Sequence, residues 1–453
     1  MINWRRPMLK FYDERVMNRP IPRCRTLISD FYALPREARR NLRDQRLTQL
    51  LRHAARHVPH YRKLLVDREI ARGDVIDLAS FGKVPPLTRS FLQNSPESLK
   101  SDDLSSRHSY KNSSGGSSGE PVAVIQDQDY NAMGIAMTET YHGWVGRDAG
   151  ESLVKLWGSD RDVVSGTLGW RNKLSGFVRN QKWANSFKMS ETAMLRYLDW
   201  IRQYRPVLIE AYADSAFELA RFANARETRV SGVRHVITSA GTLHPFMREE
   251  ISRAFGCPTL NRYGCREVGD IAGERTENGG LEVFDYCNLV EVVKPDGQPC
   301  QEGEEGEVLV TNLTNFAMPL IRYRLGDRAV VGKFSDGPLP FVEQLQTVSG
   351  RQTDAFILRD GTAVSGIFFV YFLTVFHEAG WLLKTQIVQR DYDDVVVKMV
   401  VKTAPAQSAL DEIATSLRIL LGQSCNISFE TLQEIPPLKS GKHSYVVSLV
   451  KRP

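Results

Sequence analysis

Apolar and basic residues alternate at helical spacing near the start of the chain. Leucine, alanine and valine recur every three or four positions from Leu47 to Val58, with arginines between them. Such spacing places the apolar side chains on one face of a helix. Pro59 follows at once, and proline breaks a helix that it interrupts. The pattern predicts a helical N-terminal region over about residues 1–65, with a helix that ends before Pro59.

From about residue 190 the pattern alternates between helices and strands. Apolar residues at helical spacing run from Met194 to Tyr204, and Ser190 in front of them is of a type that caps helices. The next segments are predicted in turn as strand, helix, strand, helix and strand: 206–212, 215–225, 233–241, 245–255 and 257–264. Strands that alternate with such helices predict right-handed crossovers and a mostly parallel sheet.

After residue 280 strand-like segments predominate, with turns that contain glycine and proline between them. These segments are 281–293, 306–313 and 318–325, and they predict a β-rich subdomain. Beyond Gly350 the pattern changes to strands at 354–361 and 395–401 and a helix at 408–422.

We therefore place a domain boundary near Gly350. The expected fold class is α/β. Residues 1–350 are predicted to form a large N-terminal domain with mostly parallel sheets flanked by helices plus the β-rich subdomain. Residues 351–453 are predicted to form a small α+β C-terminal domain.

Composition is that of an ordinary globular protein. Of 453 residues, 42% are hydrophobic and 25% are charged, which excludes disordered, collagen-like and disulfide-scaffold chains. The most apolar run, 367–376, is about half the length of a membrane-spanning helix, and the start has no apolar stretch of signal-peptide length. The six cysteines form no C-x-x-C pair. We expect a cytoplasmic protein without a membrane span.

Positive charge is concentrated at the start of the chain. The net charge is +6, but residues 1–65 alone carry sixteen Lys and Arg against five Asp and Glu. This excess fits a solvated helical face, and it also fits a docking surface for an acidic partner, such as a phosphorylated cofactor or a carrier protein. Aromatic residues are not interleaved with the basic ones in the way that nucleic-acid recognition favours, so we expect no nucleic-acid partner.

Five short motifs are candidates for chemistry, and the first is the run of small residues Ser113–Pro121 (SSGGSSGEP). Small residues let successive backbone N–H groups approach an anion, and hydroxyls donate to phosphate oxygens. The run lacks the Gly-Lys-Ser/Thr ending of a Walker A loop. Its composition fits a phosphate-binding loop and a flexible linker equally well.

The second motif, Tyr263–Gly269 (YGCREVG), directly follows a predicted strand. Ligands bind at the carboxyl ends of parallel strands in open α/β sheets. An aromatic ring there can stack on a base, and a carboxylate can hold a divalent metal ion. The alternative is a turn whose glycine provides a positive φ angle.

The remaining motifs are weaker when each is taken alone. Tyr323–Asp327 (YRLGD) ends in an aspartate that can accept two hydrogen bonds from a ribose diol, although Gly-Asp turns are common. Gly350–Asp354 (GRQTD) lies at the predicted boundary. Leu438–Lys442 (LKSGK) lies near the end of the chain, where a lysine is usually solvated.

The order of the five motifs resembles that of the adenylate-forming (acyl-activating) superfamily. Three further segments are similar to the branch of that superfamily with phenylacetate–CoA ligases, coenzyme F390 synthetases and CapK-like proteins. These segments are Gln49–Arg62, Val84–Arg89 and Phe246–Gly269, and the resemblance runs from about residue 40 to the end of the chain. Members join a carboxylic acid to ATP with loss of pyrophosphate, and a thiol then displaces AMP. A mobile C-terminal domain rotates between the two half-reactions.

The resemblance implies a role for each matching residue. The β- and γ-phosphates would be held by Ser114, Gly115, Gly116, Ser117, Ser118 and Gly119. Tyr263, followed by Gly264, would lie against adenine near the turn that ends at Gly241. Asp327 would hold the ribose hydroxyls, and Arg351 would lie beside ribose and phosphate. Catalysis would depend on Glu267, which would bind Mg²⁺, and on Lys442, which would reach the carboxylate and the α-phosphate.

Four positions depart from the pattern of the superfamily: Gly115, Glu120, Arg266 and Thr353. A carboxylate at position 120 beside a triphosphate is electrostatically unfavourable unless it points away. These departures motivate an alternative, a degenerate non-catalytic nucleotide-binding relative that acts in a biosynthetic pathway, for example that of a polysaccharide. Against that alternative, the family residues Glu267, Asp327, Arg351 and Lys442 are all present.

The acid and the thiol are less well specified. Trp157 and Tyr212 are walls of the acid pocket by the resemblance, and core aromatic residues otherwise. The expected cofactors are ATP and Mg²⁺, and the acceptor is CoA or a phosphopantetheinyl carrier protein. An acidic acyl or aryl carrier protein is the partner that the basic N-terminal region would suit.

Overall fold

The computed structural model describes residues 3–113, 122–157, 170–186, 189–335, 337, 339–351, 355–359, 363–365, 381–436 and 445–450. These residues form two compact units. The first contains the described residues up to Val348, and the second contains those from Ser349 onward.

The N-terminal region of the first unit is helical, as predicted. Its helices are α1 (Arg5–Phe11), a π-helical segment (Tyr12–Val16), α2 (Ile21–Ala33), α3 (Arg36–His57) and α4 (Pro59–Asp67). The predicted end before Pro59 is confirmed, because α3 ends at His57 and Pro59 begins α4. Leu47, Leu50 and Ala54 of α3 are fully buried in one core cluster with valines of the antiparallel strands described below.

Several basic residues of this region are paired with acidic residues of the same unit. Arg36 binds Glu343, and Arg56 binds Asp74. The Nη2 atom of Arg62 lies 2.7 Å from Oδ2 of Asp102, and Nη1 of Arg25 lies 3.1 Å from Oε2 of Glu139. These pairs support the interpretation of the charge excess as a solvated helical face.

One sheet of eleven strands runs through the first unit, in the order β12-β13-β14-β15-β11-β10-β9-β8-β7-β5-β6. Its parallel half consists of β5 (Leu153–Leu156), β6 (Gln181–Ala184), β7 (Leu208–Tyr212), β8 (His235–Ser239) and β9 (Thr259–Cys265). The helices between these strands are α8 (Trp170–Val178), α9 (Glu191–Tyr204), α10 (Ala213–Asn224) and α11 (Pro245–Phe255). The predicted alternation is therefore confirmed, and Ser190 caps α9 by accepting a hydrogen bond from the backbone N–H of Ala193.

The other half of the sheet is formed by the β-rich segments after residue 265. Its strands are β10 (Gly269–Glu274), β11 (Leu281–Val283), β12 (Asn288–Val293), β13 (Glu305–Asn312), β14 (Tyr323–Phe334) and β15 (Val342–Arg351). The β-rich part continues the parallel sheet through the antiparallel pair β9–β10. Segment 281–293 is two strands and not one, because a turn at 284–287 buries Phe284 and Tyr286 in the core. Residues 318–322 precede β14, although the sequence predicted a strand from 318.

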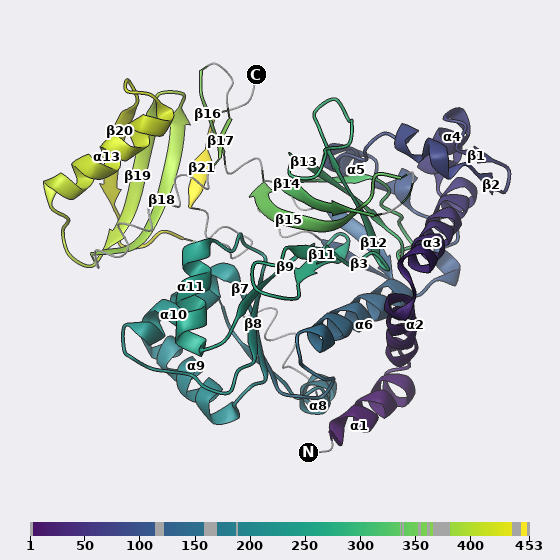
Figure 1. Cartoon of the computed structure of the whole chain (residues 1–453), viewed down its shortest axis with the longest axis horizontal. Helices are drawn as coiled ribbons and strands as arrows, with labels where there is room; N and C mark the ends of the chain where they lie inside the picture. Colours follow the sequence, from purple (N-terminus) through teal and green to yellow (C-terminus); the bar gives the residue numbers. More distant parts are fainter. Residues whose placement is uncertain are drawn as a thin grey trace. The chain divides into compact units, whose positions relative to one another are not determined.

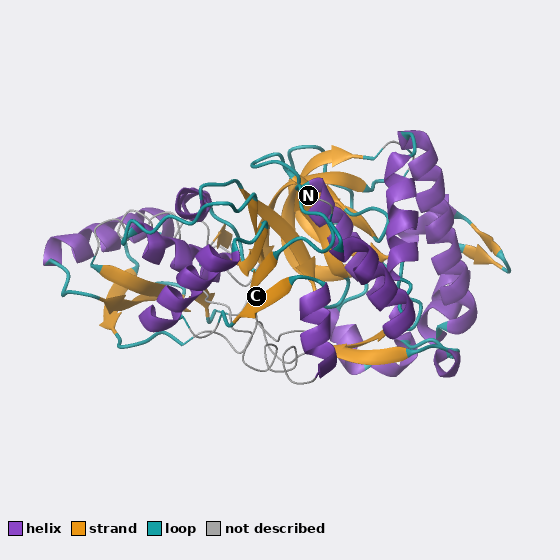
Figure 2. Cartoon of the chain, turned by 90° about the horizontal axis from the view of Figure 1, so that it is seen from below, coloured by secondary structure: helices purple, strands orange, loops and turns teal. Residues whose placement is uncertain are grey.

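Helices cover the sheet on both faces. Helices α9, α10 and α11 gather on one side of the parallel strands (Figure 1). Helix α6 (Gln128–Trp144) lies between the sheet and α2, and buried residues of α2 and α6 share one core cluster (Figure 1). Figure 2 shows the same sheet from below, with helices beside the strands.

Shorter elements complete the first unit. These are β1 (Ala71–Arg72), β2 (Val75–Ile76), α5 (Arg89–Asn94), β3 (Ser109–Ser113), β4 (Ala123–Asp127) and three 3₁₀ helices (Leu78–Lys83, Pro96–Leu99 and Leu104–Ser106). Strands β3 and β4 pair antiparallel, with Ser113 opposite Ala123. The pair of strands thus brackets the run of small residues.

The second unit contains a four-stranded sheet in the order β20-β19-β18-β21 and a hairpin. Its elements are β16 (Ala355–Ile357), β17 (Ala363–Ser365), β18 (Leu382–Asp391), β19 (Asp394–Val401), α13 (Gln407–Leu421), β20 (Asn426–Thr431) and β21 (Val446–Ser448). The predicted helix at 408–422 and strand at 395–401 are confirmed as α13 and β19. Among the helices that the structure describes, each is too short or too polar to cross a membrane.

Candidate active site

Two of the predicted site residues meet through a hydrogen bond. Tyr263 on β9 and Asp327 on β14 belong to strands that are not neighbours in the sheet. The hydroxyl of Tyr263 nevertheless donates to Oδ2 of Asp327 at 2.7 Å. Both residues are half-buried. The fold therefore brings together the second and third sequence motifs, which lie 64 residues apart.

Gly264 allows the close approach of β10 to β9. A Cβ atom at this position would lie 2.7 Å from the carbonyl oxygen of Gly269 and 3.0 Å from Cα of Asp270. Both of those contacts are with backbone, which cannot move aside in a paired strand. The turn between Tyr263 and Gly269 therefore requires glycine at position 264.

Glu267 lies in this turn and is buried. Its side chain is 5% exposed, and its Oε1 atom lies 3.6 Å from Nη1 of Arg89. Arg89 is the first residue of α5, which Thr88 caps by accepting a hydrogen bond from the backbone N–H of Phe91. Sequence analysis gave Arg89 no role, although it ends the segment Val84–Arg89 that carries part of the resemblance.

A single carboxylate suits Mg²⁺, which is commonly held by one or two carboxylates together with substrate phosphates. The donor chemistry of Glu267 fits that use, because its carboxylate is a hard oxygen ligand. The guanidinium of Arg89 balances the negative charge of the buried carboxylate when no other cation does.

The start of the small-residue run lies next to the same turn. Nη1 of Arg266 donates to the backbone oxygen of Ser113 at 3.5 Å, and Nδ2 of Asn112 donates to the backbone oxygen of Arg266 at 3.4 Å. The arginine that departs from the family pattern is thus in contact with the strand that leads into the run.

Several predicted site residues lie outside the described residues. Ser114, Gly115, Gly116, Ser117, Ser118, Gly119, Glu120, Thr353 and Lys442 are among them. Arg351 is the last residue of β15, and only its backbone is described. The roles of these residues stay predictions.

Trp157 and Tyr212 pack against each other at the carboxyl ends of parallel strands. Their ring centroids are 4.3 Å apart, and the ring planes are inclined by 46°. Trp157 follows β5, and Tyr212 ends β7. The guanidinium carbon of Arg262 lies 5.7 Å from the centroid of the Trp157 ring. The two aromatic residues therefore lie where open α/β sheets bind ligands.

A network of charged side chains connects β5, β7, β9 and β10. Glu210 on β7 is 1% exposed and bonds to Arg262 on β9, while Nζ of Lys155 on β5 lies 3.0 Å from its other oxygen. Nη1 of Arg262 also lies 3.3 Å from Oδ2 of Asp270 on β10. Burial alone would raise the pKa of Glu210, but Arg262 and Lys155 outweigh it and hold this pKa below its usual value.

The turn after β8 has a strained residue. Ala240 has φ +65°, in the left-handed region that a non-glycine residue seldom adopts. Such a conformation costs of the order of 1–3 kcal/mol and is concentrated at functional sites. A Cβ at the next residue, Gly241, would contact Asp214 and Ala213 at the start of α10 at ordinary distances. The predicted adenine-side turn therefore lies close to Tyr212, the residue before α10.

His244, three residues after that turn, predicts a pH dependence of stability. Burial lowers the pKa of His244 to about 4, below the value of about 6.5 in an unfolded chain. The unfolded state then binds more protons between these values, so the free energy of unfolding falls as the pH drops from 6.5 towards 4.

His244→Phe keeps a ring parallel to Phe246, whose centroid lies 5.6 Å from that of His244, and removes the titration. Urea unfolding at pH 7 and pH 4.5 should show a loss in wild type that is larger by about 1–2 kcal/mol than the loss in this variant. An equal loss in both would contradict the assignment.

Comparisons with known proteins show which proteins this chain resembles. A family model described as the CapK C-terminal domain matches residues 358–449. Protein CapK of Staphylococcus aureus is 21% identical over 425 residues, which cover 90% of this chain and 89% of CapK. Phenylacetate-coenzyme A ligase of Escherichia coli (strain K12) is 26% identical over 333 residues, which cover 70% of this chain and 72% of the ligase.

A solved structure has a similar fold over nearly the whole chain. It is 2-hydroxyisobutyryl-CoA ligase in the postadenylation state, in complex with R3-HIB-AMP. The TM-score is 0.69 at 18% identity, with coverage of 92% of this chain and 90% of that one. These matches confirm the predicted α/β fold class and the resemblance to adenylate-forming proteins of the CapK and phenylacetate–CoA ligase branch.

Proposed function

We propose that this chain, which has the fold of the adenylate-forming superfamily and resembles CapK and phenylacetate–CoA ligases, is an AMP-forming acid–thiol ligase. In the first step, a carboxylate oxygen of the acid attacks the α-phosphorus of ATP, and pyrophosphate leaves. In the second, a thiol attacks the acyl carbon of the acyl-adenylate, loses its proton, and displaces AMP. No protein nucleophile is needed in either step.

The observation that carries the proposal is the meeting of Tyr263 with Asp327 beside the turn of Glu267. In the proposed complex, the ring of Tyr263 lies against adenine, as aromatic side chains do on base faces. The carboxylate of Asp327 accepts hydrogen bonds from the ribose hydroxyls. The bond from Tyr263 already orients that carboxylate before any nucleotide binds.

Glu267 would hold Mg²⁺, and Arg89 would turn from this carboxylate to the incoming phosphates. Mg²⁺, when bound, stabilises the charge that develops on the phosphate oxygens. Because attack of one anion on another builds negative charge, positively charged groups and backbone N–H donors are the expected stabilisers. Ser114–Gly119, Arg351 and Lys442 are proposed to complete this set around the β- and γ-phosphates, the ribose and the α-phosphate.

The acid would bind between the Trp157–Tyr212 pair and the turn at Gly241. The two rings present flat apolar surface, which suits an acid with an aromatic or a compact apolar group. CoA is the favoured acceptor, because the similar ligases act on coenzyme A by name. A phosphopantetheinyl carrier protein is the second acceptor to test. ATP and CoA are both cytoplasmic compounds, which supports a cytoplasmic location.

A non-catalytic nucleotide-binding protein is the second candidate. The departures at Gly115, Glu120, Arg266 and Thr353 favour it, and Arg266 occupies a place beside Ser113 at the entrance to the phosphate run. Such a protein would bind ATP and fail to exchange pyrophosphate.

Acid-dependent exchange of labelled pyrophosphate into ATP separates the two candidates. We expect exchange with at least one member of a panel of aromatic, hydroxy and short aliphatic acids. Asp327→Asn tests the nucleotide site in the same assay, because it keeps the shape of the side chain but loses its charge and one acceptor. We expect this variant to raise the KM for ATP by about tenfold. Binding of ATP without exchange for any acid would favour the non-catalytic candidate.

A further inference from the structure

The backbone of the turn that carries Glu267 is held by side-chain amides. Nε2 of Gln126 on β4 donates to the backbone oxygen of Arg266 at 2.8 Å and to that of Glu267 at 3.3 Å. Gln126 is 1% exposed, so these bonds are shielded from water. Its own Oε1 atom accepts from Nδ2 of Asn112 at 2.9 Å, which fixes which end of the amide points at the turn.

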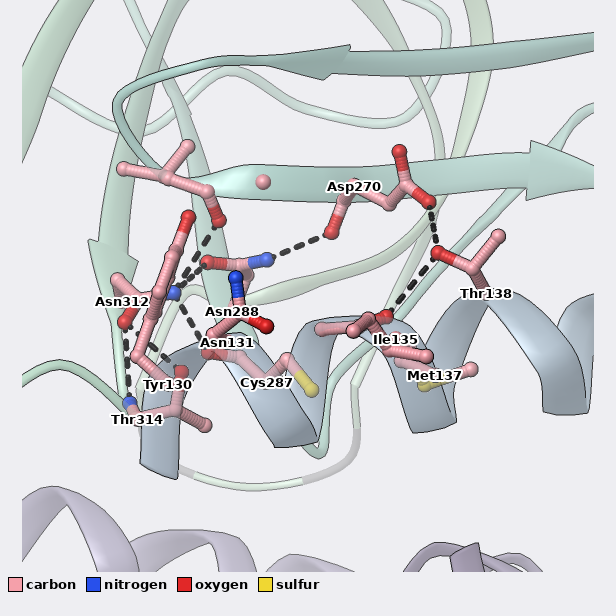
Figure 3. Close-up of a pocket in the computed structure, with 13 residues that line it drawn as sticks. Tyr130, Asn131, Ile135, Met137, Thr138, Asp270, Cys287, Asn288, Asn312 and Thr314 are labelled. Carbon is pink, nitrogen blue, oxygen red and sulfur yellow. Dashed lines mark hydrogen bonds between the residues drawn. The ribbon is translucent and has the colours of Figure 1, made fainter. Parts of the chain in front are cut away.

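Two further amides hold the end of the turn and the start of β10. Nδ2 of Asn312 donates to the backbone oxygen of Val268 at 3.2 Å, and Nδ2 of Asn288 donates to that of Asp270 at 2.8 Å (Figure 3). Nδ2 of Asn312 also donates to Oδ1 of Asn288 at 2.8 Å, so the two amides fix each other. The carbonyl groups of residues 266, 267, 268 and 270 thus all accept from amide side chains.

Packing from the side of α6 holds this turn only in part. A cavity of about 240 Å³ lies there, between α6 and the start of β10 (Figure 3). Val268, Gly269 and Asp270 line it, opposite Ile135 and Met137 of α6. Gly269 adopts φ +79°, and a Cβ atom here would lie 3.1 Å from the hydroxyl oxygen of Tyr130 on α6. Because α6 packs only partly against the turn, the hydrogen bonds from the amide side chains help to fix where the turn lies.

We propose that Gln126, Asn288 and Asn312, here called the amide clamp, are positioning residues that fix the carboxylate of Glu267 for Mg²⁺. The inference rests on the proposed function, in which Glu267 holds the metal ion. Residues that orient a metal ligand without touching the metal typically change metal affinity about 10- to 100-fold when they are lost. The amide clamp acts on the backbone of the ligand and not on its side chain.

The test is the Mg²⁺ concentration that half-saturates binding of a non-hydrolysable ATP analogue, measured by titration calorimetry. Gln126→Leu removes both bonds to the turn, and we expect this concentration to rise about tenfold. Binding of the analogue without Mg²⁺ should change less than about twofold, because the clamp acts through the metal ligand. The matched control is Gln344→Leu, which removes an equivalent bond from Nε2 to a backbone oxygen, at Gly279 in another turn.

A second variant guards against loss of folding. Gln126→Met has nearly the same length and removes the donor without adding a charge. Its rise in half-saturating Mg²⁺ concentration should resemble that of Gln126→Leu. An unchanged Mg²⁺ concentration in this variant would overturn the role of the donor, and thermal unfolding of each variant shows whether it is folded.

The outcomes separate the clamp from the proposed function. Unchanged Mg²⁺ half-saturation in Gln126→Leu, in a protein whose wild type exchanges pyrophosphate, would overturn the amide clamp alone. A wild type that exchanges no pyrophosphate would contradict the proposed function, while the Mg²⁺ titration of the same variants would still decide the clamp.

Discussion

Lys442→Ala should nearly abolish acid-dependent pyrophosphate exchange. Lys442 ends the late motif Leu438–Lys442, and its ammonium is proposed to bridge the carboxylate of the acid and the α-phosphate. Both groups are negative, so a fixed cation aligns them and stabilises the charge of the transition state. Loss of one such preorganised group typically costs on the order of a hundred- to a thousand-fold in rate. The measurement is the initial rate of exchange at saturating ATP and acid.

The second half-reaction provides the contrast. In the proposed mechanism the C-terminal domain rotates before thiol attack and carries Lys442 away, so supplied acyl-adenylate should still be converted to thioester. Lys439→Ala is the control, because it removes the same charge three residues earlier in the motif. Normal exchange by Lys442→Ala would refute the role given to the C-terminal domain. Loss of exchange in Lys439→Ala would mean that Lys439, and not Lys442, is the catalytic lysine.

Sequence patterns predicted the parallel half of the sheet well. Helix α11 occupies the predicted 245–255, and β7, β8 and β9 lie within one or two residues of the predicted strands at most of their ends. Periodicity succeeds there because each helix buries one face and each strand is largely buried on both faces. It failed at 281–293, where apolar residues continue through a turn because Phe284 and Tyr286 reach the core from the turn itself.

Sequence motifs identified several residues of the candidate site but not the contacts between them. Tyr263, Glu267 and Asp327 could be named from local sequence, but the contact between Tyr263 and Asp327 joins two strands that are not neighbours and depends on the fold of the whole sheet. Arg89 and Gln126 gave no local signal of a role. Each acts on the Glu267 turn from more than a hundred residues away in the chain, through contacts that exist only in the folded structure.

Glu210→Gln should lower the free energy of unfolding by about 3–5 kcal/mol. Glu210 on β7 lies between Arg262 on β9 and Lys155 on β5, all in the parallel half of the sheet. Loss of its charge leaves the buried guanidinium of Arg262 paired with Asp270 and removes the carboxylate that Lys155 contacts, and uncompensated buried charge is strongly destabilising. Urea unfolding at pH 7 measures the change. Glu69→Gln, at an exposed pair with Arg72, should cost less than about 1 kcal/mol.

A double variant decides whether the loss comes from unpaired charge. Arg262→Leu alone leaves Glu210 beside Lys155 and His142, whereas Glu210→Leu with Arg262→Leu removes one charge of each sign. The double variant should therefore lose clearly less stability than the sum of the single Leu variants, by more than about 1 kcal/mol. Additive losses would mean that packing of these side chains beneath Trp157, and not their charge, stabilises this part of the sheet.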